Sequence, residues 1–123
     1  MTKKKILIVD DEQTITKLLK FVLEKTGIYE LMCENESLKA LEVIRSVRPD
    51  LLILDINMPG VSGAEISEIL KKDASFKDTP ILFLTGNVSD EESEMGLMID
   101  GHPTLSKPIN MERLLDVIAK NIR

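Results

Sequence analysis

Short uninterrupted aliphatic segments alternate along this chain with segments that mix apolar and polar residues. Such apolar runs, bounded by acidic or turn-forming residues, are typical of strands that are buried on both faces of a sheet. The clearest runs are residues 6–9, 51–54 and 81–84. Two weaker segments, 29–33 and 104–106, predict strands at the edges of the sheet. Pro103 favours an edge for the last strand because proline cannot donate a hydrogen bond to a neighbouring strand.

Helical periods of apolar residues separate the predicted strands. The first helix is indicated by Ile15, Leu18, Leu19, Val22 and Leu23, which recur at the spacing of one helix face. A less regular period near 37–47 predicts the second helix. The last helix would bury Met111, Leu114, Leu115, Ile118 and Ile122.

Capping residues mark the starts of three helices. Ser62 with Glu65 has the spacing of a capping box, and so does Ser89 with Glu92 ahead of a predicted fourth helix, whose first turn is acidic. Asn110 is the expected N-cap of the last helix. Five alternating β-α units in one small domain predict an α/β fold, with a parallel sheet and helices on both faces.

Ligands of such folds bind beyond the carboxyl ends of the strands, where the strand order reverses. The residues that follow the predicted strands are Asp10, Asp11 and Glu12, then Asp55, then Thr85 and Gly86, and finally Lys107 and Pro108. Clustered carboxylates repel one another and require a cation or raised pKa values, and an all-oxygen set suits Mg²⁺. Taken singly, each residue is also an ordinary turn, cap or surface residue; the joint occurrence predicts phosphoryl chemistry, with a carboxylate as nucleophile and a lysine for the phosphate charge.

Composition narrows the class of protein. With 123 residues, 43% of them hydrophobic and 30% charged, the chain fits one folded domain. A net charge of −5 and only 3% aromatic residues disfavour direct nucleic-acid binding. The single cysteine, Cys33, cannot form an internal disulfide and is expected in the core. A signal peptide and a membrane span are both absent from the pattern, so we expect a cytoplasmic protein.

These motifs together resemble the receiver domain of two-component response regulators. The resemblance rests on Val9-Asp10-Asp11-Glu12, Leu54-Asp55-Ile56-Asn57-Met58-Pro59-Gly60 with Gly63, Leu84-Thr85-Gly86 and Ser106-Lys107-Pro108. It covers essentially the whole chain, residues 1–123, as a single receiver domain. It implies a flavodoxin-like, doubly wound sheet of five parallel strands in the order 2-1-3-4-5.

The resemblance also implies a role for each site residue. Asp55 would be the phosphoacceptor, and Asp10, Asp11 and Asp55 would bind Mg²⁺ together with the backbone carbonyl of Asn57. Lys107 would contact the phosphoryl group, and Thr85 would hydrogen-bond it and move inward. The implied partners are a sensor histidine kinase or histidine phosphotransfer protein as donor and a downstream effector or output domain. The chain would be a monomer or a phosphorylation-dependent dimer, and a phosphoacceptor switch rather than an enzyme.

One position departs from the family pattern. Three residues before Lys107, where the family usually has Tyr or Phe as the second half of the switch, this chain has Thr104. An alternative reading is therefore a receiver-fold interaction module with weakened switching. An aspartate-nucleophile phosphatase is disfavoured because Asn57 replaces the aspartate that would act as general acid, and a flavin carrier is disfavoured because Asp10, Asp11 and Glu12 would repel its phosphate.

Overall fold

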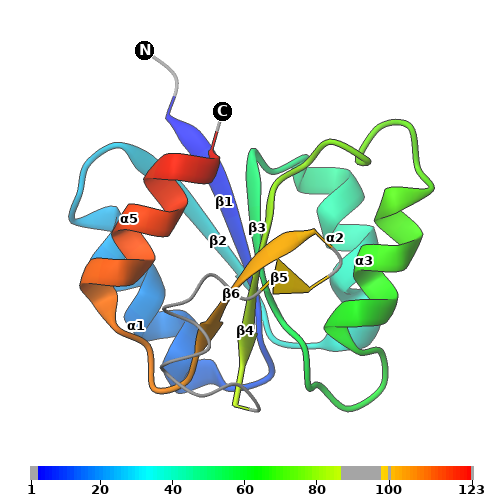
Figure 1. The fold of residues 1–123 in the computed structure, drawn as a ribbon, viewed down its shortest axis with the longest axis horizontal. Coiled ribbons are helices and arrows are strands. Elements are labelled where there is room, and N and C mark those ends of the chain that lie inside the picture. The colour runs from blue at the N-terminus through cyan, green and yellow to red at the C-terminus, as the bar shows by residue number, and fades with distance from the viewer. Residues whose placement is uncertain (1–2, 87–97, 100, 123) are drawn as a thin grey trace.

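A central sheet between two layers of helices forms the computed structural model, which describes residues 3–86, 98–99 and 101–122 (Figure 1). The strands are β1 (Lys4–Val9), β2 (Tyr29–Glu34), β3 (Leu51–Asp55), β4 (Ile81–Thr85), β5 (Met98–Ile99) and β6 (His102–Ser106). Their order across the sheet is β2-β1-β3-β4-β6-β5. The predicted parallel order 2-1-3-4-5 is confirmed, and the predicted fifth strand is β6.

The two-residue β5 lies beyond β6 and was not predicted. It runs antiparallel to β6, with Met98 opposite Pro103 and Ile99 opposite His102. Two residues are too few to produce a recognisable apolar run. As a result, Pro103 lies on the last but one strand of the described sheet and not at its edge.

The helices cover both faces of the sheet. The described helices are α1 (Gln13–Glu24), α2 (Ala40–Val47) preceded by a 3₁₀ turn at Ser37–Lys39, α3 (Gly63–Lys71) and α5 (Met111–Asn121). Helices α1 and α5 lie on one face, and α2 and α3 on the other (Figure 1). The predicted fourth helix, with its capping pair Ser89 and Glu92, falls outside the described residues.

Successive side chains of a strand point to opposite faces of the sheet, so alternate residues pack into two separate hydrophobic cores. Ile6, Ile8, Ile53 and Leu84 pack on the side of α1 and α5. Leu7, Val9, Leu54 and Phe83 pack on the side of α2 and α3. The central strands are fully buried, which explains why their sequences are uninterrupted apolar runs.

Two of the predicted helix caps are confirmed. The Ser62 hydroxyl accepts from the Glu65 amide at 3.1 Å, and the Ser62 amide donates to the Glu65 carboxylate at 3.5 Å, which completes the capping box of α3. Asn110 caps α5 by accepting from the Arg113 amide at 3.1 Å. Cys33 is free and half-buried, packed against the core beside α1, and burial raises the pKa of its thiol. Among the described residues, no helix is long and apolar enough to cross a membrane.

Gly63, the first residue of α3, lets this helix approach the end of β3. A Cβ atom at Gly63 would lie 2.3 Å from the carbonyl oxygen of Asp55 and 2.9 Å from the Cα of Ile56, so it would collide with backbone. The Gly63 amide also donates to the Ile56 carbonyl at 2.9 Å. Glycine at this position therefore allows the start of α3 to lie directly against the backbone of Asp55 and Ile56.

Substituting Gly63 tests this close approach. We expect Gly63→Ala to lower the free energy of unfolding by about 2 kcal/mol or more, because overpacking against backbone forces α3 away from β3. Gly86→Ala is the control, since a Cβ there meets no atom of the described residues within 4 Å. Urea denaturation measures both variants, and equal stabilities would contradict the steric argument.

Candidate functional site

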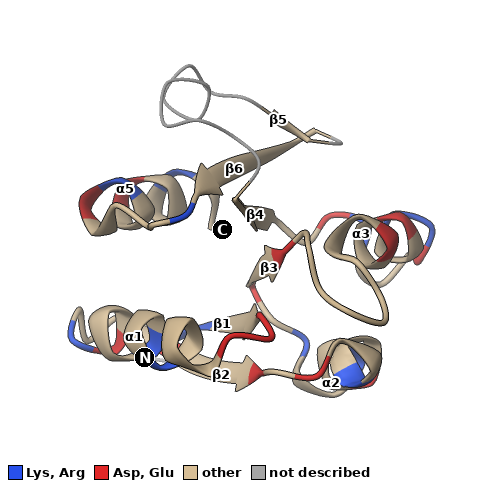
Figure 2. Cartoon of the chain, turned by 90° about the horizontal axis from the view of Figure 1, so that it is seen from below, with Lys and Arg blue, Asp and Glu red and all other residues tan. Residues whose placement is uncertain are grey.

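The carboxyl ends of β1 and β3 bring three carboxylates together. Asp10 directly follows β1, Asp55 is the last residue of β3, and Asp11 begins the loop into α1. One oxygen from each lies within 4.8 Å of the others. Asp10 and Asp55 are buried, with exposed fractions of 0% and 2%, whereas Asp11 is exposed. Figure 2 shows acidic segments at the ends of β1, β2 and β3 next to one another.

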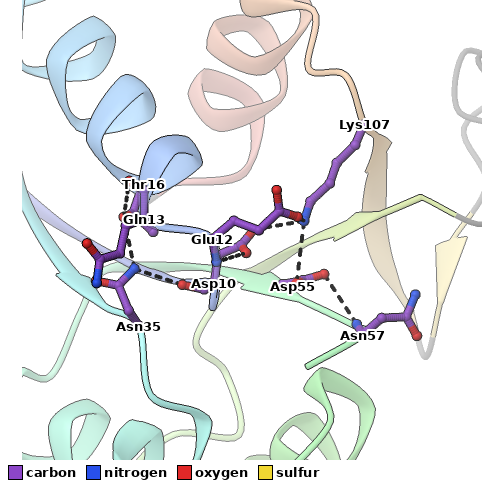
Figure 3. A network of polar contacts seen from close by, with 8 residues as sticks. All are labelled: Asp10, Glu12, Gln13, Thr16, Asn35, Asp55, Asn57 and Lys107. Carbon is purple, nitrogen blue, oxygen red and sulfur yellow. Dashed lines mark hydrogen bonds and ion pairs between the residues drawn. The ribbon is translucent and has the colours of Figure 1, made fainter. Parts of the chain in front are cut away.

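Backbone amides hold one oxygen of each buried carboxylate. The Glu12 amide donates to Asp10 Oδ1 at 2.9 Å, and the Asn57 amide donates to Asp55 Oδ1 at 3.2 Å (Figure 3). The other two oxygens, Asp10 Oδ2 and Asp55 Oδ2, are buried, and among the described residues they face the Lys107 ammonium at 3.0 and 3.4 Å. With Asp11 beside them, these carboxylates form a cluster of oxygen ligands of the kind that Mg²⁺ prefers.

Lys107 supplies the positive charge of the site. Its Nζ lies 3.0 Å from Asp10 Oδ2, 3.0 Å from Glu12 Oε1 and 3.4 Å from Asp55 Oδ2. Its own amide donates to the Thr85 carbonyl at 3.0 Å, so the backbone that carries the lysine is tied to the end of β4. One lysine therefore faces three carboxylates, and the cluster keeps an excess of negative charge.

The pKa values of the site reflect this imbalance. Burial and, secondly, the charge of Asp10 raise the pKa of Asp55 from 3.8 to about 6, although Lys107 and the Asn57 amide act in the opposite direction. Burial alone would lower the pKa of Lys107, but its hydrogen bonds to Asp10 and Glu12 and the surrounding carboxylate charges raise it above its ordinary value. Lys107 is therefore protonated at neutral pH.

The remaining residues predicted for the site lie at or near the same edge. Thr85 is the last residue of β4 and is 2% exposed, and its neighbour Leu84 pairs with Asp55 in the sheet. Asn57 is exposed, two residues beyond Asp55. Thr104 is buried in β6 and lies opposite Phe83 in the register, away from the carboxylates by sheet position. The structure thus gathers Asp10, Asp11, Asp55 and Lys107, with Thr85 beside them on the sheet.

Two contacts of the site were not predicted from the sequence. Glu12 was noted only as part of an acidic strand end, yet it shares Lys107 with Asp10. Asn35 donates from Nδ2 to the Asp10 carbonyl at 2.9 Å, although it lies after β2. Its position directly after β2 was the signal that the sequence offered.

Comparisons with known proteins agree on one family. The profile of the response regulator receiver domain matches residues 6–119. The transcriptional regulatory protein YvrH of Bacillus subtilis is 34% identical over 89% of this chain and 45% of its own length. The phosphate regulon transcriptional regulatory protein PhoB of Pseudomonas aeruginosa is 36% identical over 94% of this chain and 50% of its own length. The chain thus spans about half the length of these curated relatives.

Solved structures of similar proteins have the same fold. The chemotaxis protein CheY4 of Vibrio cholerae superposes with a TM-score of 0.83 at 31% identity, over 98% of this chain and 100% of that one. A response regulator receiver domain protein from Clostridium thermocellum gives a TM-score of 0.81 at 30% identity, over 97% of this chain and 94% of that one.

The raised pKa of Asp55 predicts a pH-dependent stability of the metal-free protein. The folded protein holds this proton more tightly than the unfolded chain, so stability from this group is present below pH 3.8 and is lost as the pH rises through about 6. We therefore expect Asp55→Asn, in the presence of EDTA, to stabilise the protein at pH 7.5 and to flatten its stability between pH 4 and 6.

Denaturation with urea across that pH range measures the effect. Glu68→Gln on the exposed side of α3 is the control and should leave the pH profile unchanged. An Asp55→Asn protein that is less stable than the wild type at pH 7.5 would contradict the assignment of the electrostatic penalty to Asp55.

Proposed function

This chain belongs to the response regulator receiver domain family of two-component systems, and we propose on this premise that it is a signalling switch phosphorylated at Asp55. The observation that carries the proposal is the environment of Asp55: a buried carboxylate at a strand end, with Lys107 3.4 Å away and two further aspartates within 4.8 Å. This combination serves phosphoryl transfer, in which positioning and charge neutralisation do most of the catalytic work.

The proposed donor is a phosphohistidine of a sensor histidine kinase or histidine phosphotransfer protein. An oxygen of the Asp55 carboxylate attacks phosphorus, and a new P–O bond forms as the P–N bond of the donor breaks. The electron pair of the broken bond remains on the imidazole nitrogen of the donor. Asp55 must be ionised to act as nucleophile, and its pKa of about 6 leaves most of it ionised at neutral pH.

Each residue of the site has a proposed part in this step. Lys107 holds a positive charge where the phosphoryl oxygens would lie, and Thr85 offers its hydroxyl from the adjacent strand end. Asp10, Asp11 and Asp55 would hold Mg²⁺, with the Asn57 carbonyl as a further ligand. When bound, Mg²⁺ neutralises charge on the carboxylates and on the phosphoryl oxygens.

A phosphoacceptor is favoured over an enzyme with a separate substrate. Asn57 stands two residues after Asp55, where a phosphatase with an aspartate nucleophile would need a carboxylic acid to protonate its leaving group. An amide cannot supply that proton. The protein would therefore catalyse only its own phosphorylation and slow autodephosphorylation.

The output is proposed to be altered affinity for a downstream effector or output domain. Thr85 and Thr104 lie on strands that pair with each other, and the Lys107 amide links β6 to the Thr85 carbonyl. A shift of Thr85 toward a phosphoryl group would thus act on β6 through backbone contacts, even without an aromatic residue at 104. We propose that the chain acts in the cytoplasm, as a monomer or a phosphorylation-dependent dimer, without contacting nucleic acid itself.

Direct phosphorylation tests the proposed acceptor. Incubation with Mg²⁺ and acetyl phosphate should add the mass of one phosphoryl group to the intact protein, and EDTA should abolish the adduct. Asp55→Asn should lose it, whereas Asp50→Asn, at the other end of β3, should keep it. No adduct on the wild type, or an equal adduct on Asp55→Asn, would rule out Asp55 as the acceptor.

A second measurement tests whether the switch reaches β6. With Mg²⁺ and beryllium fluoride as phosphoryl mimic, we expect amide NMR shift changes at Thr85 and also at Thr104, transmitted through the Lys107–Thr85 backbone hydrogen bond. Asp55→Asn provides the control spectrum without a bound mimic. Changes restricted to the residues around Asp55, with β6 unaffected, would instead favour an interaction module with weak switching.

A further inference from the structure

The segment between β2 and α2 contributes no residue to the proposed site, yet it touches both loops that form it. Residues 34–37 leave β2 at the same edge of the sheet where β1 and β3 end. The Glu34 carbonyl accepts from the Asp10 amide at 3.2 Å. Two side chains of this segment, Asn35 and Ser37, extend these contacts in opposite directions.

Asn35 holds the loop after β1. Its Nδ2 donates to the Asp10 carbonyl at 2.9 Å and to Thr16 Oγ1 at 3.0 Å, and Thr16 in turn donates to the Gln13 carbonyl at 3.1 Å (Figure 3). Both amide hydrogens of Asn35 are therefore used. They join the backbone of Asp10 to the first turn of α1, and so fix both ends of the loop that carries Asp11 and Glu12.

Ser37 holds the loop after β3. Its hydroxyl donates to the Pro59 carbonyl and accepts from the Val61 amide at 3.2 Å, and the side chain is buried. The chain curls around this hydroxyl at Gly60, which has a φ of +88°. A Cβ atom there would lie 2.8 Å from Ser37 Oγ. The turn that follows Asn57 is thus built around the hydroxyl of a residue more than twenty positions earlier.

We propose that Asn35 and Ser37 are positioning residues of the cation site, one for each of its two loops. This inference rests on the proposed function, since it concerns the Mg²⁺ that Asp10, Asp11 and Asp55 would hold. Neither side chain carries charge or reaches the carboxylate oxygens. Their effect is to limit the movement of the backbone that carries Asp10 on one side and Asn57 on the other.

Because Mg²⁺ is small, its affinity depends on how closely the ligands keep their positions. This ion requires short, nearly octahedral contacts, whereas Ca²⁺ accepts longer and less regular ones. Mutation of residues that hold metal ligands in place without contacting the metal typically changes metal affinity by about 10- to 100-fold. Loosening either loop should therefore weaken Mg²⁺ more than Ca²⁺, while a loss of ligand charge would weaken both.

Calorimetric titration of the unphosphorylated protein with Mg²⁺ and with Ca²⁺ tests this inference. We expect Asn35→Ala and Ser37→Ala each to weaken Mg²⁺ binding about tenfold, with a smaller change for Ca²⁺, and the double variant to be weaker still. Ser37→Thr retains the hydroxyl and should bind Mg²⁺ within about threefold of the wild type. Circular dichroism establishes that each titrated variant is folded.

Thr26→Ala is the matched control. The Thr26 hydroxyl also bridges two backbone groups, donating to the Leu23 carbonyl at 2.7 Å and accepting from the Ile28 amide at 3.3 Å, but it lies at the far end of α1. Mg²⁺ affinities of Asn35→Ala and Ser37→Ala equal to the wild type, equal losses for both ions, or an equal loss in Thr26→Ala would each overturn the inference. A wild-type protein that binds no Mg²⁺ would refute the proposed cation site itself.

Discussion

Electrostatic repulsion among the carboxylates at one edge of the sheet is the constraint on which the rest of the site depends. The fold buries Asp10 and Asp55 side by side and provides a single lysine for both. Burial of like charges is unfavourable unless cations or protons compensate. Burial and the charge of Asp10 therefore raise the pKa of Asp55. A bound cation would offset part of the carboxylate charge, and a phosphoryl group on Asp55 would add charge to the same cluster. Both would therefore change the electrostatic energy of the site.

The parallel sheet makes this crowding possible because it gathers strand ends that are far apart in the chain. Strands β1 and β3 pair with Val9 opposite Leu54, so the next residues, Asp10 and Asp55, reach the same level of the sheet. Gly63 then allows α3 to close against the end of β3, and Asn35 and Ser37 tie the neighbouring loops to the end of β2. The packing of the strands and the hydrogen bonds of the surrounding loops thus keep the carboxylates close together despite their mutual repulsion.

Much of this arrangement could be predicted from the sequence, for physical reasons that differ between elements. Buried parallel strands require continuous apolar runs, so 51–54 and 81–84 were recognisable, and the residues after them were predicted to meet at one edge. The capping box of α3 is a local signal, and it was found. The two-residue β5 has no periodicity to detect, and the contact between Glu12 and Lys107 joins residues separated by most of the chain. Asn35 and Ser37 act through backbone atoms of distant loops, and no local pattern reveals such contacts.

The position of Lys107 links this electrostatic balance to the remainder of the sheet. Its side chain is shared by Asp10, Glu12 and Asp55, while its amide is bonded to the Thr85 carbonyl. A new anion on Asp55 would compete with Asp10 and Glu12 for the same ammonium group. Any resulting shift of the lysine would pull on the backbone that joins β6 to β4. Lys107 therefore contacts the carboxylates through its side chain and the end of β4 through its backbone amide. This connection consists of the Lys107 side chain and the Lys107–Thr85 main-chain hydrogen bond, and it includes no atom of residue 104.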